Sequence, residues 1–191
     1  MIAVRLDFDD AEFIDFTRKL GPAEIQRAMQ TAVRNTARWV RTQVSKNVRG
    51  EMDLPRKVIA YRLKQYNKAW RMGMDGGTAV KVWFGIDPLK ADKIDKPTYN
   101  TKTSDIGPTK PKGYKVRQWE FENAFIPKQG RYAGKLMERT TKNRLPIRRS
   151  TVTIDEQGEK AFLAIAEQIP ARMEYEAKRE LRHQVFKTLG E

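Results

Sequence analysis

The sequence predicts an α+β fold in which long basic N-terminal helices and a C-terminal helix cover a small, mainly antiparallel sheet. Three observations predict it: apolar residues recur at helical spacing over residues 22–47, they do so again from residue 156 onward, and short segments between them alternate apolar with polar residues. A length of 191 residues suits one core. We therefore expect a single domain over residues 1–191.

The N-terminal third opens with a strand and then becomes helical. Residues 2–8 alternate apolar with polar or small side chains, which predicts a strand with one buried face. An aspartate at position 9 or 10 can cap a short apolar helix that Gly21 ends. Pro22 then suits the first turn of a helix whose apolar residues keep a 3.6-residue period to about Asn47.

Basic residues gather on this helix and on the next one. After an expected break at Gly50, Pro55 opens a second basic helix over residues 55–70. The candidate contact residues on the two helices are Arg27, Arg34, Arg38, Arg41, Arg56, Lys57, Arg62 and Lys64. They fit three alternatives: a solvated helix face, contact with DNA, or contact with an acidic neighbouring subunit.

The pattern in the middle of the chain predicts strands on both sides of one long irregular segment. Alternation predicts strands over residues 78–86 and 114–126, with two more strand-like segments at 131–140 and 146–154. Residues 88–113 contain four prolines and almost no periodicity, so we expect an extended loop that serves as an assembly arm.

Two further features complete the order of elements. A basic turn joins the last two strand-like segments, and its candidate contact residues are Lys142, Arg144, Arg148 and Arg149. The chain closes with a helix from about Glu156 to Leu189 that is interrupted near Pro170.

Charge indicates a polyanion as a neighbour. The net charge is +14 and the isoelectric point is about 10.0, and residues 22–72 hold 12 Lys and Arg against 3 Asp and Glu. Clustered cations release counterions when they meet phosphates. Both ends of the chain carry a small acidic excess, so subunits that bind head to tail in a ring are a further interpretation.

The residues needed for most enzyme chemistry are missing. There is no cysteine and only one histidine, His183, which excludes thiolate metal sites and Ser-His or Cys-His triads. The sequence contains neither GxxxxGK[ST] nor GxGxxG, the two familiar glycine-rich motifs that bind phosphate. Glu120 and Glu122, with Asp87, could hold magnesium, but the lysine typical of nucleases does not follow, so we expect these carboxylates to pair with nearby cations. We expect no catalytic residue, metal or cofactor.

Location and binding mode give two more expectations. Residues 1–10 contain three aspartates and no long apolar run, and no segment approaches the ~20 apolar residues of a membrane span. We therefore expect a soluble protein made inside the cell, without membrane contact. Aromatic residues between basic ones, such as Tyr61 and Trp70, would also suit a protein that binds single-stranded nucleic acid.

Residues 124–147, AFIPKQGRYAGKLMERTTKNRLPI, resemble the minor tail protein Z family, the tail completion proteins of lambda-type siphophages. The similar features are Ala124-Phe125-Ile126, a Gly-containing turn, a strand ending in Arg139, and the basic turn before Leu145-Pro146-Ile147. Upstream, AMQTAVRNTARWVRTQVSK and LPRKVIAYRLK are similar to that family's alanine-rich helix and its basic successor. The likeness covers nearly the whole chain, apart from the segment before Pro22 and the proline-rich insertion.

The resemblance implies a structural virion protein at the head-proximal end, or neck, of a phage tail, assembled in the host cytoplasm. It implies a ring, most simply a hexamer, whose partners are tail terminator or tail tube proteins, head-tail connector proteins and the end of the genomic DNA. Such a protein completes the tail for head-tail joining and positions the genome end. The competing class is a sequence-independent nucleic-acid-binding protein that forms no ring.

Overall fold

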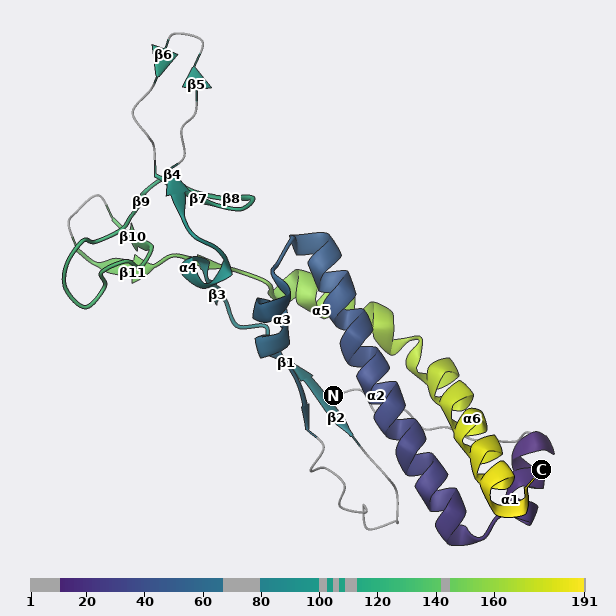
Figure 1. The fold of residues 1–191 in the computed structure, drawn as a ribbon. Coiled ribbons are helices and arrows are strands. Elements are labelled where there is room, and N and C mark those ends of the chain that lie inside the picture. The colour runs from purple at the N-terminus through teal and green to yellow at the C-terminus, as the bar shows by residue number, and fades with distance from the viewer. Residues whose placement is uncertain are drawn as a thin grey trace. The chain divides into compact units, whose positions relative to one another are not determined.

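The computed structural model confirms the α+β class, with long helices at both ends of the sequence and small antiparallel sheets between them (Figure 1). It describes residues 11–66, 80–99, 103–104, 107–108, 113–141 and 145–190. The strand predicted over residues 2–8 lies outside this part of the chain.

Tertiary contacts divide the chain into two compact units, each built from separate stretches of sequence. Unit 1 contains residues 1–47, 62–84 and 160–191, and unit 2 contains residues 48–61 and 85–159. Three helices have residues in both units: α2 (Pro22–Met52), α3 (Arg56–Arg62) and α5 (Asp155–Ala166). The expectation of one domain over the whole chain stays a prediction.

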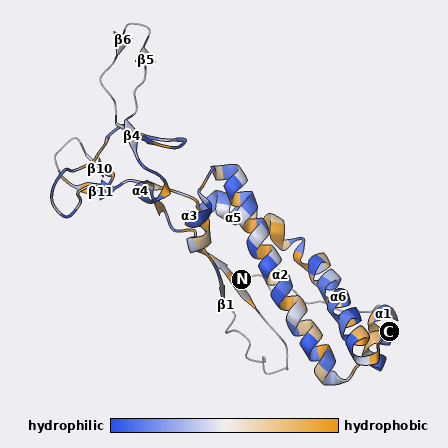
Figure 2. Cartoon of the chain, viewed as in Figure 1, coloured by the Kyte–Doolittle hydropathy of each residue, from blue (hydrophilic) through white to orange (hydrophobic). Residues whose placement is uncertain are grey.

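Unit 1 is a helical hairpin closed by a short third helix. Helix α2 runs antiparallel to α6 (Ile169–Leu189), and α1 (Ala11–Lys19) packs against α6. The buried clusters show the direction, because Ala28 packs with Leu181 and Val185 whereas Ala32 packs with Met173 and Ala177. The small side chains of Ala28 and Ala32 leave room between the helices for the larger apolar side chains of α6. In Figure 2 apolar and polar residues interleave along both helices, as amphipathic helices require.

The boundary after α2 differs from the prediction. Gly50 does not end the helix, which continues to Met52 and stops at Asp53, whose φ is 45°. A single glycine inside a helix costs only about 1 kcal/mol relative to alanine. The end of α2 is therefore decided by the groups that bind its last carbonyls and not by Gly50.

The predicted second basic helix is much shorter than expected. Helix α3 spans only Arg56–Arg62, and Leu63–Tyr66 forms strand β1, antiparallel to β2 (Lys81–Phe84). Residues 67–70 of the predicted helix lie outside the described residues. Leu63 is buried and faces Phe84 across the pair, so strand pairing prevails here over local helix propensity. The predicted strand over 78–86 is confirmed with shorter bounds.

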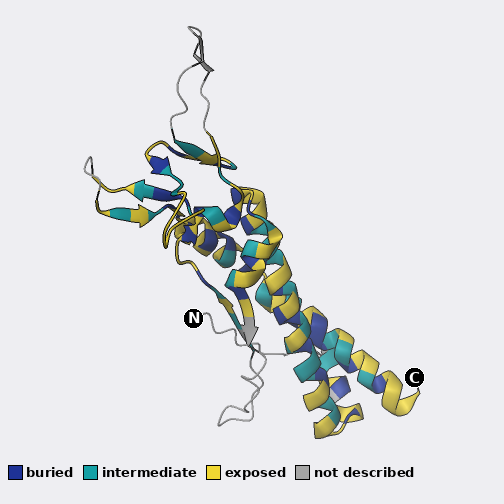
Figure 3. Cartoon of the chain, turned by 60° about the vertical axis from the view of Figure 1, so that its left-hand side comes forward, coloured by how far each residue is buried: buried dark blue, intermediate teal, exposed yellow. Residues whose placement is uncertain are grey.

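Unit 2 consists of short strands around a small buried centre. Its strand pairs and triplets are all antiparallel. The strands are β3 (Leu89–Lys90), β4 (Thr98–Tyr99), β5 (Thr103–Ser104), β6 (Gly107–Pro108), β7 (Tyr114–Val116), β8 (Trp119–Phe121), β9 (Ala124–Phe125), β10 (Met137–Arg139), β11 (Ile147–Arg149) and β12 (Thr151–Val152). Leu136, Met137 and Ile154 are among its most buried side chains. Figure 3 shows how exposed residues flank these short strands.

Two predictions in unit 2 were wrong. Residues 114–126 are not one strand, because a turn at Arg117 folds β7 back on β8 and a second turn precedes β9. The start of the predicted arm is also ordered: β3 pairs with β12, α4 (Ala91–Ile94) follows, and Leu89 and Ile94 are buried. Apart from β5 and β6, residues 100–112 lie outside the described residues, and the assembly arm stays a prediction there.

The C-terminal prediction is confirmed in its main feature. The helical region starts at Asp155, breaks after Ala166 and resumes at Ile169, next to Pro170. Four residues of the predicted apolar face, Met173, Ala177, Leu181 and Val185, are buried. Leu189, the last residue of that face, remains 48% exposed.

Candidate polyanion-binding face

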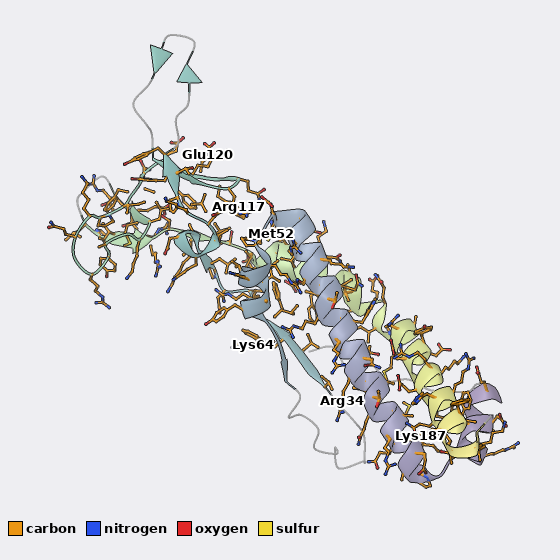
Figure 4. All side chains as sticks on the ribbon, viewed as in Figure 1. Arg34, Met52, Lys64, Arg117, Glu120 and Lys187 are labelled. Atoms are coloured by element: carbon orange, nitrogen blue, oxygen red, sulfur yellow. The ribbon has the colours of Figure 1, made fainter. Side chains whose placement is uncertain are left out.

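Four arginines form one stripe along α2. Arg27, Arg34, Arg38 and Arg41 are all exposed, and 3.6 residues per turn place them within an arc of about 60°. Ala32 and Thr36, which are buried, lie on the opposite side of the helix. Arg34 accordingly projects from the side of α2 away from α6 (Figure 4). We call these four residues the arginine stripe.

The arginine stripe has few carboxylates to neutralise it. No Asp or Glu occurs between residues 25 and 50. Within the described part of the chain, the guanidinium groups of Arg27, Arg38 and Arg41 form no salt bridge. Aligned cations repel one another, so an external polyanion would gain the attraction of Arg27, Arg38 and Arg41 without displacing a salt-bridge partner in the described part of the chain.

The basic residues of α6 have a different environment. Arg179 lies 2.7 Å from a carboxylate oxygen of Glu176 and 2.8 Å from one of Glu180, and its hydrogen bond to Glu180 raises the pKa of the guanidinium group. Arg182 donates to Glu12 on α1 at 2.8 Å. Arg179 pairs within α6 and Arg182 joins α6 to α1, so both cations have carboxylate partners inside unit 1.

The remaining predicted residues of the basic helices are dispersed. Arg56 and Lys57 are exposed on α3 in unit 2, whereas Arg62 and Lys64 belong to unit 1. Arg62 is partly buried, and Lys64 is exposed on β1 opposite Trp83. Because these residues fall in different units, the arginine stripe alone defines the candidate face.

The structure describes only part of the predicted basic turn. Lys142 and Arg144 lie outside the described residues. Arg148 is exposed, with its Nε 3.5 Å from a carboxylate oxygen of Glu138 on the paired strand. Arg149 is partly buried and forms a two-pronged pair with Asp92, with 2.8 Å between Arg149 Nε and Asp92 Oδ1. Its role as a contact residue stays a prediction.

Electrostatics supports a structural role for Arg149. Burial alone would raise the pKa of Asp92, but the hydrogen bond from Arg149 and its positive charge hold that pKa below the ordinary 3.8. The same hydrogen bond raises the pKa of Arg149. Both groups therefore remain charged and paired at neutral pH.

Glu120 and Glu122, considered above as magnesium ligands, do not lie on one strand. Glu120 is in β8 opposite Lys115, whereas Glu122 is in the turn that follows, so the two do not share one strand face. Both interact with other groups of the chain. Among the described residues, no three His, Cys, Asp or Glu side chains are grouped to hold a metal ion. His183 is exposed on α6.

Sequence reasoning missed a basic loop between β9 and β10. It assigned residues 131–140 to a strand, but residues 131–134 form a turn and only Met137–Arg139 are extended. The available signal was a run of three cations, Lys128, Arg131 and Lys135, around Tyr132, without an acidic residue from 123 to 137.

Comparison with known proteins adds no relative. No family model, no curated protein and no solved structure matches the chain. In the described residues, no helix is both long and apolar enough to cross a membrane.

Proposed function

We propose that this protein is a structural component of a long-tailed phage virion. It would complete the head-proximal end of the tail as a ring and contact the genome end through the arginine stripe of α2. The observation that carries the proposal is the exposed arginine stripe, in which Arg27, Arg38 and Arg41 form no salt bridge with the residues that the structure describes. The resemblance of residues 28–64 and 124–147 to the tail completion family supplies the biological setting.

The arginine stripe suits a nonspecific DNA contact. Arg27 and Arg41 are 14 positions apart, which corresponds to about 21 Å along a helix. Side chains at several heights can therefore reach successive phosphates without reading base edges. The binding would be sequence-independent and would weaken as salt rises. Such behaviour fits a conduit through which any genome sequence passes.

Charge reversal of three arginines tests the DNA contact. The variant Arg34→Glu, Arg38→Glu, Arg41→Glu should bind duplex DNA at least tenfold more weakly, and its log-log salt slope should be shallower by about 2.7, since each neutralised phosphate contributes about 0.9. The matched control is Lys90→Glu, Lys160→Glu, Lys187→Glu, which changes the same charge at exposed positions. Equal DNA affinity and salt slope in the two triple variants would refute the contact.

Phage assembly distinguishes a DNA contact from a protein contact. If the arginine stripe faces DNA, the arginine variant should enter tails that then fail to retain or position the genome end. If it faces an acidic neighbouring ring, the subunit should never join the tail. Normal infectious particles would contradict both roles and leave the arginine stripe as a solvated face.

The ring itself needs a separate measurement. Size-exclusion chromatography with light scattering, with and without tail tubes, should show a closed oligomer or incorporation into tubes. A monomer that binds DNA but never associates with tubes would support the alternative, a sequence-independent nucleic-acid-binding protein. The two classes therefore differ in assembly and not in DNA affinity.

A further inference from the structure

The β9–β10 loop is ordered by its own hydrogen bonds. The amide of Gly134 donates to the carbonyl of Pro127 at 3.0 Å, and that of Ala133 donates to Gly130 at 3.0 Å. Gly130 and Gly134 have φ values of 85° and 72°, which glycine adopts without strain. Residues 128–134 are exposed. A loop folded in this way loses little conformational entropy when a ligand binds.

This loop places two cations close to one aromatic ring. The guanidinium carbon of Arg131 lies 5.8 Å from the centre of the Tyr132 ring, and Lys135 Nζ lies 5.7 Å from it. Lys135 also donates to the carbonyl oxygen of Arg131 at 3.0 Å, which fixes its position. Tyr132 is 40% exposed, so part of its ring surface can be reached by a ligand. Cations beside an accessible ring are the groups that bind phosphate and an unstacked base.

A second aromatic-cation pair lies at the other end of the same hairpin. The guanidinium carbon of Arg139 in β10 is 5.4 Å from the centre of the Phe125 ring in β9. Both residues line an open groove of about 620 Å³ with Glu122, Asn123, Thr140 and Thr141. Its walls offer a ring face and hydrogen-bonding groups. Because the Glu122 carboxylate repels phosphate, a base fits this groove better than a phosphate does.

We propose that the β9–β10 hairpin binds single-stranded nucleic acid. Tyr132 stacks on one base, Arg131 and Lys135 hold the flanking phosphates, and the groove at Phe125 and Arg139 accepts a neighbouring base. A duplex suits this surface less well, because its bases are stacked on one another and present no free face to Tyr132. The proposal concerns unit 2 and does not depend on the arginine stripe.

The test compares single-stranded and duplex oligonucleotides of one sequence on the full-length protein. Tyr132→Ala should weaken binding of a labelled thymidine oligonucleotide roughly tenfold, in the range of one lost stacking contact, and Tyr132→Phe should retain near wild-type affinity because the ring remains. Duplex binding should change less than twofold in both. The matched control is Phe186→Ala, which removes another exposed aromatic ring.

The cations and the groove are tested in the same assay. Arg131→Gln with Lys135→Gln should weaken single-strand binding and make its salt dependence shallower, whereas Lys90→Gln with Lys187→Gln should not. Arg139→Gln should weaken single-strand binding selectively. If Tyr132→Ala and Phe186→Ala bind the single strand equally well, or if Tyr132→Ala weakens both nucleic acids to the same extent, the proposal is overturned. Unchanged DNA binding in the arginine-stripe variant would not contradict the proposal for the β9–β10 hairpin.

Discussion

Arg117 closes the C-terminal end of α2 by donating a hydrogen bond from Nη1 to the carbonyl oxygen of Asp53 at 3.0 Å. The same nitrogen lies 2.9 Å from an Asp53 carboxylate oxygen, and Arg117 Nε donates to Asp95 at 3.0 Å. Next to Arg117, Gln118 donates to the carbonyl oxygen of Met52 at 3.3 Å. The last carbonyls of a helix have no partner within it, so the β7–β8 turn supplies partners that end α2 at this point.

Removal of the Arg117 side chain should destabilise unit 2. Arg117 and Asp53 have φ values of 53° and 45°, in a region that costs a non-glycine residue about 1 kcal/mol or more. Arg117→Ala loses the contacts and retains this cost, and we expect about 1 kcal/mol of lost stability, since Asp53 is largely exposed. Arg117→Gly should be less destabilising despite its smaller side chain. Urea unfolding compares the stabilities of the two variants. If Arg117→Ala were more stable than Arg117→Gly, the role of backbone strain would be contradicted.

The Asp92–Arg149 pair should contribute more than a surface ion pair. Its side chains are only 10% and 21% exposed, so Asp92→Asn or Arg149→Gln should cost about 3 kcal/mol by leaving one buried group without its partner. A double variant, Asp92→Ala with Arg149→Leu, should cost less than the sum of the single changes. The control is Arg148→Gln, at the exposed neighbouring position. Additive costs in urea unfolding would show that the two residues act independently.

The same pair predicts a dependence of stability on acid. Because the pKa of Asp92 is lowered in the folded protein, its contribution is present above the ordinary value of 3.8 and is lost as pH falls through the folded pKa. The free energy of unfolding should therefore fall as pH falls through this acidic range. In the Asp92→Asn variant, the free energy of unfolding should fall less steeply over the same range. Parallel pH profiles for the two proteins would contradict the assignment.

Tyr114 should titrate at unusually high pH. Its ring stacks on that of Tyr99 with centres 4.8 Å apart, and a hydrogen bond with Tyr99, aided by burial, raises the pKa of Tyr114 to about 12. A raised folded pKa means that this contribution is present below pH 10 and is lost as pH rises through about 12. Absorbance titration of tyrosinate should lose its latest step in Tyr114→Phe. If Tyr114→Phe instead lost a tyrosinate step near pH 10, the raised pKa of Tyr114 would be contradicted.

Ala32 should tolerate no larger side chain. It is fully buried between α2 and α6, where it packs against Met173 and Ala177. Ala32→Leu forces the two helices apart and should cost about 2 kcal/mol, which lowers Tm by about 5 °C for a chain of this length. Thr42→Leu, at an exposed position of the same helix, should change Tm by less than about 1 °C on the same argument. Equal effects would place Ala32 outside a packed interface.

The sequence alone determined the elements whose signal is local. The 3.6-residue spacing within residues 22–47 and within 169–189 requires only neighbours on the same helix, and both helices are confirmed. The same spacing placed Arg27, Arg34, Arg38 and Arg41 on one face before any partner was known. Residues 63–66 were predicted as helix but form a strand, because strand pairing with residues 81–84 is a nonlocal contact that the local pattern does not contain.

The tertiary structure decided which charges remain available. Arg149 and Arg182 look no different from the arginines of α2 in the sequence, yet Arg149 meets Asp92 57 positions away and Arg182 meets Glu12 170 positions away. Folding also converted the segment around Tyr132 from a predicted strand into a basic loop. Composition determines how many cations a chain carries, but long-range packing determines which ones receive an internal carboxylate, because that pairing depends on distance in space and not along the chain.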